Sequence, residues 1–231
     1  MKIIAIIPAR GNSKSIPKKN LIKFLGKPLI YWSIKQALET KLISDVYVTS
    51  DNNEILNFSK KLGAKIIKRP KKLSIDRAPS ESAILHAISK IKELPDIIVF
   101  MQATSPVRKK NDIKNAINQF IKEKSDSLFS GSKLLDFNVW LQTKKNLKSL
   151  NYNYKNRKIR QLNEDSMWCE NGSFYIFKPD IIKKYNNRLG GKISIYPMDI
   201  LQSFEIDEVK DIKFLAQLEE AHLKNLLILN I

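Results

Sequence analysis

The sequence predicts an α/β protein with a mostly parallel sheet and helices on both of its faces. Short apolar runs typical of buried strands alternate with longer amphipathic stretches typical of helices as far as Ser132. The 231 residues, of which 43% are hydrophobic and 28% are charged, suffice for one large globular domain. Every apolar run is shorter than the roughly 20 residues that a membrane-spanning helix needs. We therefore expect residues 1–231 to form a single three-layer domain without a membrane partner.

Strand and helix patterns follow one another in a regular order. Five apolar runs are predicted to form strands of one sheet, at 3–7, 45–50, 64–68, 96–101 and 127–132. Amphipathic stretches between them are predicted to form helices, at 29–40, 52–63, 80–93 and 111–123. Pro28 suits the start of the first helix, and Gly63 suits the C-terminal cap of the second. A later strand at 172–177 and a long amphipathic helix at 207–228 return to the pattern.

The segment 134–168 interrupts this order, because it has no helical period. It contains clusters of Asn and Lys that are typical of turns, together with the aromatic residues Phe137, Trp140, Tyr152 and Tyr154. We predict an antiparallel excursion of two or three strands here. Aromatic side chains exposed on such an excursion would suit a partner subunit, so we expect a homodimer formed through this segment.

The net charge of +18 is typical of nucleic-acid-binding proteins, but the kind of basic residue argues against a specific nucleic-acid partner. Only seven of the 41 basic residues are arginine, and the many lysines are scattered along the chain. We expect such lysines to cover a solvated surface, and a basic nucleic-acid-binding module remains the less favoured alternative. The single cysteine, Cys169, cannot form an intrachain disulfide, which favours a reducing, cytoplasmic location.

A basic loop follows the first predicted strand. Residues 8–20 contain Gly11, Ser13 and four cationic side chains, and no acidic residue precedes Glu39. The loop lacks both the GxxxxGK[ST] and the GxGxxG pattern. Its glycine turn, backbone amides and cations could still neutralise a polyphosphate at the carboxyl edge of the sheet, where the ligands of such folds bind. A basic surface loop without a ligand is the alternative.

Two carboxylates lie close together near the end of the chain. The period of two in a strand would send Glu205 and Asp207 to one side and Ile206 to the other. Such a pair suits Mg²⁺, which prefers oxygen ligands and leaves positions for water and phosphate. The alternative is a charge cluster at the N-terminus of the last helix, and we expect Glu208 and Asp211 to serve that purpose.

Five stretches of the sequence resemble the acylneuraminate cytidylyltransferase family, the CMP-sialic acid synthetases. The first is IPARGNSKSIPKKNL at 7–21, which is similar to the family's nucleotide-binding signature. The others are RPKKLSIDRAPS, QATSPVR, NGSFYIF and FEID, which extend the resemblance over nearly the whole chain. The resemblance implies a nucleotide-diphospho-sugar transferase-like fold. It also implies Mg²⁺-dependent transfer of CMP from CTP to a 2-keto-3-deoxy sugar acid (a sialic acid-like nonulosonate), with release of pyrophosphate.

The resemblance also assigns roles to individual residues. Nucleotide binding is implied for Arg10, Ser13, Lys14, Lys19, Asn20, Arg69 and Ser80. Binding of the sugar acid is implied for Gln102, Thr104, Ser105, Arg160, Asn171 and Tyr175. Catalysis is implied for Arg10, Lys19 and Asp207, and Mg²⁺ binding for Asp207 and Glu205. We therefore expect the first loop to face the acidic pair.

Several alternatives stay open in the sequence. The family's metal motif is Asp-x-Asp, so Glu205 departs from it and either binds the metal directly or acts through water. The proton of the attacking hydroxyl could pass to Asp207 or to a metal-bound hydroxide. Arg160 could act within its own chain or across the dimer, and the Asn171–Gly172 pair could form only a hairpin turn. The identity of the acid is open, and a related nucleotidyltransferase for another sugar acid, such as KDO, is the alternative function.

Overall fold

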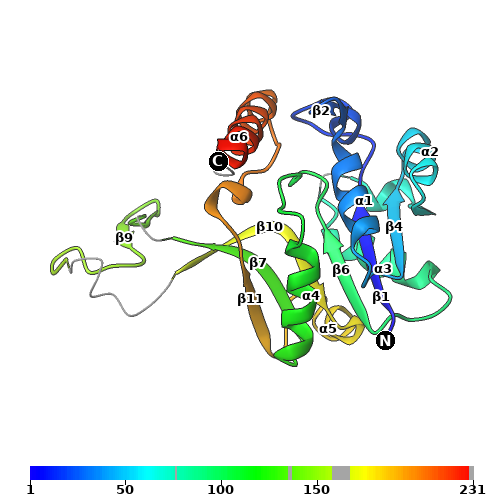
Figure 1. Ribbon diagram of the computed structural model, residues 1–231. Helices are drawn as coiled ribbons and strands as arrows, with labels where there is room; N and C mark the ends of the chain where they lie inside the picture. The colour runs from blue at the N-terminus through cyan, green and yellow to red at the C-terminus, as the bar shows by residue number, and fades with distance from the viewer. Residues whose placement is uncertain (76, 135–136, 158–166, 229–231) are drawn as a thin grey trace.

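The computed structural model describes residues 1–75, 77–134, 137–157 and 167–228, and a seven-stranded sheet forms its centre (Figure 1). The strand order is β11-β7-β10-β6-β1-β4-β5. These strands are β1 (Ile3–Pro8), β4 (Asp45–Ser50), β5 (Lys65–Lys68), β6 (Ile97–Met101), β7 (Ser127–Lys133), β10 (Trp168–Phe177) and β11 (Ile193–Pro197). Neighbouring strands run parallel except for β10, which is antiparallel to β6 and β7. The predicted mostly parallel sheet is confirmed.

Helices cover both faces of this sheet. In the described part of the chain they are α1 (Leu29–Glu39), α2 (Asn53–Lys61), α3 (Ser80–Lys90), α4 (Asp112–Lys122), α5 (Pro179–Tyr185) and α6 (Val209–Ile228). Apolar side chains of α1, α2 and α4 pack on one face, and those of α3 and α5 pack on the other. Successive residues of β1 alternate between the two cores, because Ala5 lies in the first and Ile6 in the second. None of the described helices is both long and apolar enough to cross a membrane.

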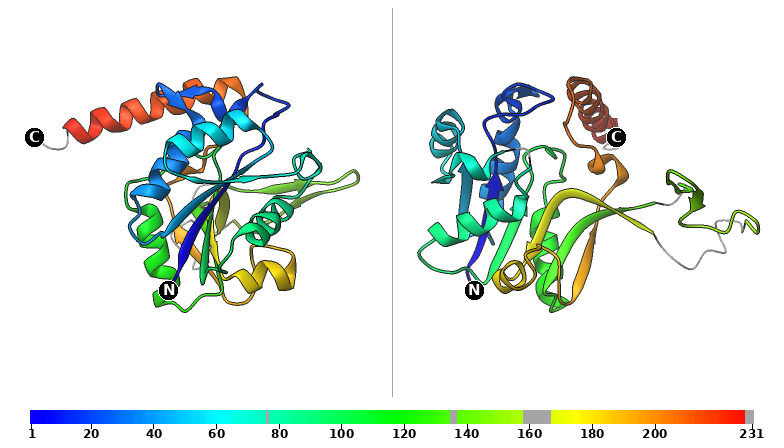
Figure 2. Two further views of the ribbon diagram at one scale, coloured as in Figure 1. Left: turned by 90° about the vertical axis from the view of Figure 1, so that its right-hand side faces the viewer. Right: turned by 180° about the vertical axis from the view of Figure 1, so that it is seen from behind.

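The last helix, α6, lies above the carboxyl edge of the sheet, near the loop that follows β1 (Figures 1 and 2). Ile206 and Leu215 are fully buried in a third apolar cluster with Ile16 and Phe24 from the region after β1. This cluster holds the end of the chain over the first loop. The short elements of this region and of the connections are β2 (Lys23–Phe24), β3 (Lys27–Pro28), η1 (Lys19–Leu21), η2 (Lys71–Leu73) and η4 (Ile200–Ser203).

The interruption predicted at 134–168 contains an antiparallel hairpin of β8 (Trp140–Gln142) and β9 (Leu147–Ser149). The hairpin projects away from the sheet, beyond the end of β7 and the start of β10 (Figure 1). The ring of Trp140 packs against Tyr152 and Tyr154, at centroid distances of 5.8 and 5.2 Å. The predicted antiparallel excursion is confirmed by this hairpin, while Arg160 lies outside the described residues.

The structure excludes one alternative and differs from the prediction in two places. The Asn171–Gly172 pair lies inside β10, at an irregularity of its pairing with β7, so the alternative of a hairpin turn is excluded. The helix α5 and the strand β11 have no predicted counterpart. The segment from Glu205 to Asp207 is not a strand of the sheet, because its backbone bonds to the loop after β6, where the N–H of Ile206 donates to the carbonyl of Thr104 over 2.8 Å.

Candidate active site

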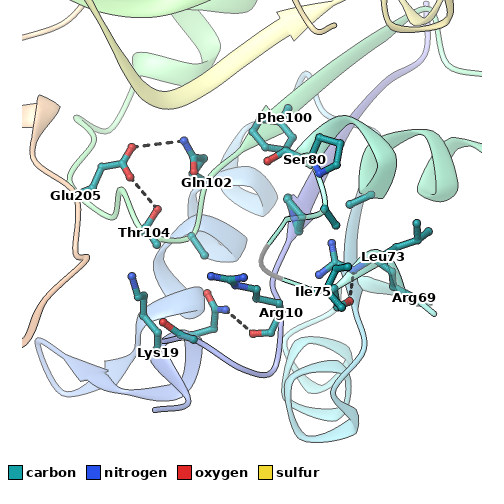
Figure 3. A pocket seen from close by; sticks show the side chains of 18 of the residues that line it. Arg10, Lys19, Arg69, Leu73, Ile75, Ser80, Phe100, Gln102, Thr104 and Glu205 are labelled. Carbon is teal, nitrogen blue, oxygen red and sulfur yellow. Dashed lines mark hydrogen bonds between the residues drawn. The ribbon is translucent and has the colours of Figure 1, made fainter. Parts of the chain in front are cut away.

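A cavity of about 330 Å³ opens at the carboxyl edge of β1 and β6 (Figure 3). Its walls come from the loop after β1, the segment between β5 and α3, the loop after β6 and the stretch before α6. Most of the predicted site residues line it: Arg10, Ser13, Lys19, Asn20, Arg69, Ser80, Gln102, Thr104, Glu205 and Asp207. The fold thus brings together polar residues that are up to 197 positions apart in the sequence, from Arg10 to Asp207.

The loop after β1 is fastened to the end of β4. The backbone N–H of Gly11 donates to Asp51 Oδ1 over 2.9 Å. A Cβ on Gly11 would lie 2.7 Å from Asn52 Cβ, so this close approach requires glycine. Asn20 Nδ2 donates to the carbonyl of Arg10 over 2.9 Å and thereby closes the loop. The basic loop is therefore a defined turn whose residues face a cavity.

Lys19 and Asp207 form an ion pair at the mouth of this cavity. Lys19 Nζ lies 2.8 Å from Asp207 Oδ1, and the two side chains are 10% and 67% exposed, respectively. Because solvent screens the Asp207 side of the pair, it contributes little to stability. Asp211 Oδ2 accepts hydrogen bonds from the backbone N–H groups of Asp207 and Glu208, over 2.9 and 2.7 Å. Asp211 therefore caps the start of α6, as expected, and leaves Asp207 directed at Lys19.

Glu205 lies deeper in the cavity than Asp207, between two polar side chains of the loop after β6. Gln102 Nε2 and the Thr104 hydroxyl donate to its two carboxylate oxygens over 3.4 and 3.3 Å (Figure 3). Burial raises the pKa of Glu205, and the negative charge of Asp207 raises it further. Ile206 points away into the third apolar cluster. The predicted alternation of the two carboxylates with Ile206 is therefore present, although it occurs outside the sheet.

Arg69 and Ser80 form the wall of the cavity that lies opposite Glu205 (Figure 3). Arg69 is buried, and its Nε donates to Ser74 Oγ over 2.9 Å. Burial lowers the pKa of Arg69, the Asp51 carboxylate opposes this shift, and the charge of Arg10 adds to it. Ser80 is the first residue of α3, where backbone N–H groups favour polar or anionic ligands. This wall and the first loop together give the cavity a cationic character that suits phosphate groups.

Four of the described site residues lie outside the cavity lining. Lys14 is exposed on the first loop, and Ser105 is a buried residue of the loop after β6. Asn171 is buried, and its side-chain oxygen accepts a 2.6 Å hydrogen bond from a serine hydroxyl of β7. Tyr175 lies in the core, where burial and a hydrogen bond to Glu170 raise its pKa. Their roles as ligands stay predictions.

The structure places three further residues, Leu73, Ile75 and Gly172, at or beside the cavity, and the sequence patterns assign none of them a role. Leu73 and Ile75 give the Arg69 wall an apolar part that suits a flat ring. Gly172 lies beneath Glu205 with a φ of +69°, and Gln102 Nε2 donates to its carbonyl over 2.7 Å. In the sequence, Gly172 belongs to the NGSFYIF stretch and follows an asparagine, a pair that also suits a turn.

The family model described as "Cytidylyltransferase" matches residues 4–229, nearly the whole chain. The chain is 33% identical over 228 residues to the pseudaminic acid cytidylyltransferase of Campylobacter jejuni strain 81-176, which covers 93% of this chain and 94% of that protein. It is 34% identical over 209 residues to N-acylneuraminate cytidylyltransferase A of Danio rerio, which covers 89% of this chain and 48% of that protein.

Two solved structures share the fold. CMP:2-keto-3-deoxy-manno-octonic acid synthetase, solved in complex with CTP, has a TM-score of 0.73 at 15% identity and covers 96% of this chain and 100% of that one. The 4-diphosphocytidyl-2C-methyl-D-erythritol synthase of Anaerococcus prevotii has a TM-score of 0.70 at 13% identity, over 95% of this chain and 96% of that one. This likeness shows the fold alone, whereas the matched family model and the relatives above 30% identity show more: the chain belongs to the cytidylyltransferase family.

Proposed function

We propose that this protein transfers CMP from CTP to a nonulosonic sugar acid and releases pyrophosphate. The observation that carries the proposal is one cavity in which Arg10, Lys19 and Arg69 face the acidic pair of Glu205 and Asp207. Three cations suit a triphosphate, and a second, polar end suits a hydroxyl-rich acid. The names of the relatives, pseudaminic acid and N-acylneuraminate cytidylyltransferase, support the same class of acceptor.

The proposed reaction is a displacement at the α-phosphorus of CTP. The anomeric hydroxyl oxygen of the sugar acid forms the new O–P bond while the bond to the pyrophosphate oxygen breaks, and the hydroxyl proton leaves to a base. Arg10 and Lys19 would neutralise the charge that builds on the phosphoryl oxygens. Gln102 and Thr104, which lie beside Glu205, would orient the acid for in-line attack.

We also propose a Mg²⁺ site at Asp207 and Glu205. Both carboxylates line the cavity, and Mg²⁺ is often held by one or two carboxylates together with substrate phosphates. The described residues contain no group of three or more His, Cys, Asp or Glu that could hold a metal without such help. When bound, the ion would supply charge neutralisation and a lower pKa for the attacking hydroxyl. Lys19, which pairs with Asp207 in this structure, could then turn to the triphosphate.

A panel of substrates tests the proposed function. We expect pyrophosphate release with CTP and at least one of N-acetylneuraminate, its deaminated analogue, legionaminate and pseudaminate, and little release with UTP, ATP or GTP. Preferential use of KDO would establish the related nucleotidyltransferase instead. The nucleic-acid alternative predicts strongly salt-dependent binding to DNA or RNA and no pyrophosphate release with any pair.

Gly172 provides a test of the acceptor end of the cavity, the end where Gln102 and Thr104 lie beside Glu205 and where the sugar acid is proposed to bind. A Cβ at this position would lie 2.6 Å from Gln102 Nε2 and closer still to Glu205 Oε1. We expect Gly172→Ala to lower kcat/KM at least tenfold, and to destabilise the fold by about 1–3 kcal/mol through its positive φ. Gly26 is a matched control, because its φ is +76° but no described residue other than its chain neighbours lies within 4 Å of an added Cβ. Gly26→Ala should lower the Tm while kcat/KM is retained, and equal kinetics of the two variants would contradict the assignment.

We further propose that the protein is a homodimer formed through the 134–168 excursion. Phe137, Leu141 and Leu147 are 56%, 47% and 61% exposed on it, which is typical of a surface that a partner covers. Light scattering should give twice the 26.7 kDa of one chain. The double variant Leu141→Glu/Leu147→Glu should be monomeric with unchanged circular dichroism, whereas Leu94→Glu, at an exposed site in the body, should stay dimeric. A monomeric wild type would contradict this proposal.

A cytoplasmic location is part of the same proposal. CTP is an intracellular nucleotide, and Cys169, the only cysteine of the chain, is free of a disulfide. Cell fractionation with an antibody to the protein would test the location.

A further inference from the structure

The guanidinium of Arg108 is buried at the place where α1, β6 and β10 meet. Its Nη2 donates to two backbone carbonyls, that of Gln102 over 2.8 Å and that of Ser173 over 2.7 Å. Its Nη1 donates to Ser33 Oγ over 3.1 Å and to Gln36 Oε1 over 2.9 Å. One side chain therefore ties a helix to the end of β6 and to the middle of β10.

Of the two residues that supply these carbonyls, Gln102 lines the acceptor end of the cavity, and Ser173 holds the Gln102 backbone. The backbone N–H of Gln102 donates to the carbonyl of Ser173 over 3.1 Å, and the Gln102 side chain donates to the carbonyl of Gly172. The same side-chain nitrogen, Gln102 Nε2, also donates to Glu205 Oε1. Arg108 thus fixes the backbone of Gln102 through its carbonyl, while the Gln102 side chain contacts Glu205 in the cavity.

The chemistry of this arrangement is unusual for a residue that only fills space. Among the described residues, the four acceptors of Arg108 are all neutral groups. Burial lowers the pKa of Arg108 to about 9, and the carboxylates of Asp112 and Glu205 oppose this shift. A buried charge without a paired carboxylate is costly, and a well-packed apolar residue often serves stability better. What the guanidinium provides instead is a planar fork of donors that fixes several acceptors in one geometry.

We propose that Arg108 is a positioning residue for the acceptor end of the active site. It sets the backbone of Gln102 and Ser173, and through them the side chains of Gln102 and Glu205, without lining the cavity itself. The kinetic part of this inference rests on the proposed function. The nucleotide end, with Arg10 and Arg69, belongs to other loops, so it should be affected much less.

Kinetics of Arg108→Lys test this role, because one ammonium group cannot reproduce the fork. With the sugar acid that gives the highest turnover, we expect KM for that acid to rise at least tenfold and kcat to fall. The Kd for CTP, measured by calorimetry well below the Tm, should stay within twofold. The smaller change Ser33→Ala removes the hydroxyl that donates to the Gln102 carbonyl over 3.0 Å, and it should shift KM in the same direction. In Arg108→Ala, millimolar methylguanidine should restore part of the activity.

A core variant distinguishes positioning from general destabilisation. Phe120 lies on α4 in the first core, and Phe120→Leu should lower the Tm while the KM for the acid is retained. If folded Arg108→Lys and Ser33→Ala keep the wild-type KM for the acid, or if Phe120→Leu shifts it equally, the positioning role is overturned.

Hydrogen exchange gives a readout that does not depend on activity. In Arg108→Lys, peptides covering 100–105 and 171–175 should exchange faster than in the wild type, while a peptide covering 8–20 should be unchanged. If exchange in all three peptides is unchanged, or increases by the same factor, the inference is overturned even in an active enzyme. An inactive wild type with the expected exchange pattern would instead contradict the proposed function and leave the positioning of Gln102 and Ser173 by Arg108 supported.

Discussion

Asp207→Ala is expected to abolish turnover, by at least about a thousandfold, while the fold survives. Asp207 is 67% exposed, so its removal opens no cavity in the core and breaks only a solvent-screened ion pair with Lys19. The expected change in Tm is therefore small. The loss of activity follows because the substitution removes the proposed metal ligand in the cavity where the triphosphate is proposed to bind.

Calorimetry and pyrophosphate release together check this result. In the absence of metal, the variant should bind CTP as well as the wild type or better, because Lys19 no longer pairs with Asp207. Binding of Mn²⁺, a spectroscopic substitute for Mg²⁺, should weaken at least tenfold. Glu208→Gln is the matched control, since Glu208 pairs with Lys210 outside the cavity, and it should keep its activity. Near-normal transfer by Asp207→Ala would contradict the metal assignment.

Lys19→Ala is the second substitution with a large expected effect. The Lys19 side chain is only 10% exposed and points from η1 into the cavity, where its ammonium lies 2.8 Å from Asp207 Oδ1. Removing one charge-stabilising donor of this kind typically lowers kcat by about 10²–10³-fold. The Tm should change little, because the pair is open to solvent on the Asp207 side.

The neighbouring Lys18 provides the control for this variant. Its side chain is 66% exposed and pairs with Glu54 on α2, outside the cavity lining. Lys18→Ala should therefore retain CTP binding and kcat, whereas Lys19→Ala should lose both. A large fall in the Tm of Lys19→Ala with normal kinetics per folded molecule would favour a structural role for the first loop.

The layers of the fold are predicted from local patterns, whereas most of the cavity residues are predicted through the resemblance to the cytidylyltransferase family. Apolar periodicity locates β1, β4, β5, β6 and β7, and parallel strands bring their carboxyl ends to one edge. Residues at those ends, such as Arg10 and Gln102, therefore meet in one cavity. The alternation of Glu205 and Asp207 is also predicted correctly, since a period of two belongs to any extended backbone, inside a sheet or outside it.

The remaining features depend on distant parts of the chain. The direction of β10 follows from the excursion that returns the chain beside β7, and apolar periodicity carries no information on strand direction. The strand β11 lies at the edge of the sheet and alternates isoleucine with serine and tyrosine, so its apolar signal is weak. Arg108 forms its network with Ser33 on α1 and Ser173 on β10, and no local pattern indicates such contacts.

Direct identification of the product tests the central claim most directly. The wild-type protein is incubated with CTP, Mg²⁺ and each nonulosonic acid, and phosphorus NMR with mass spectrometry follows the nucleotide. The account predicts equimolar CMP-sugar and pyrophosphate for at least one acid, and neither product in the Asp207→Ala variant. Unchanged CTP with every acid, or a product formed equally well from UTP or ATP, would contradict it.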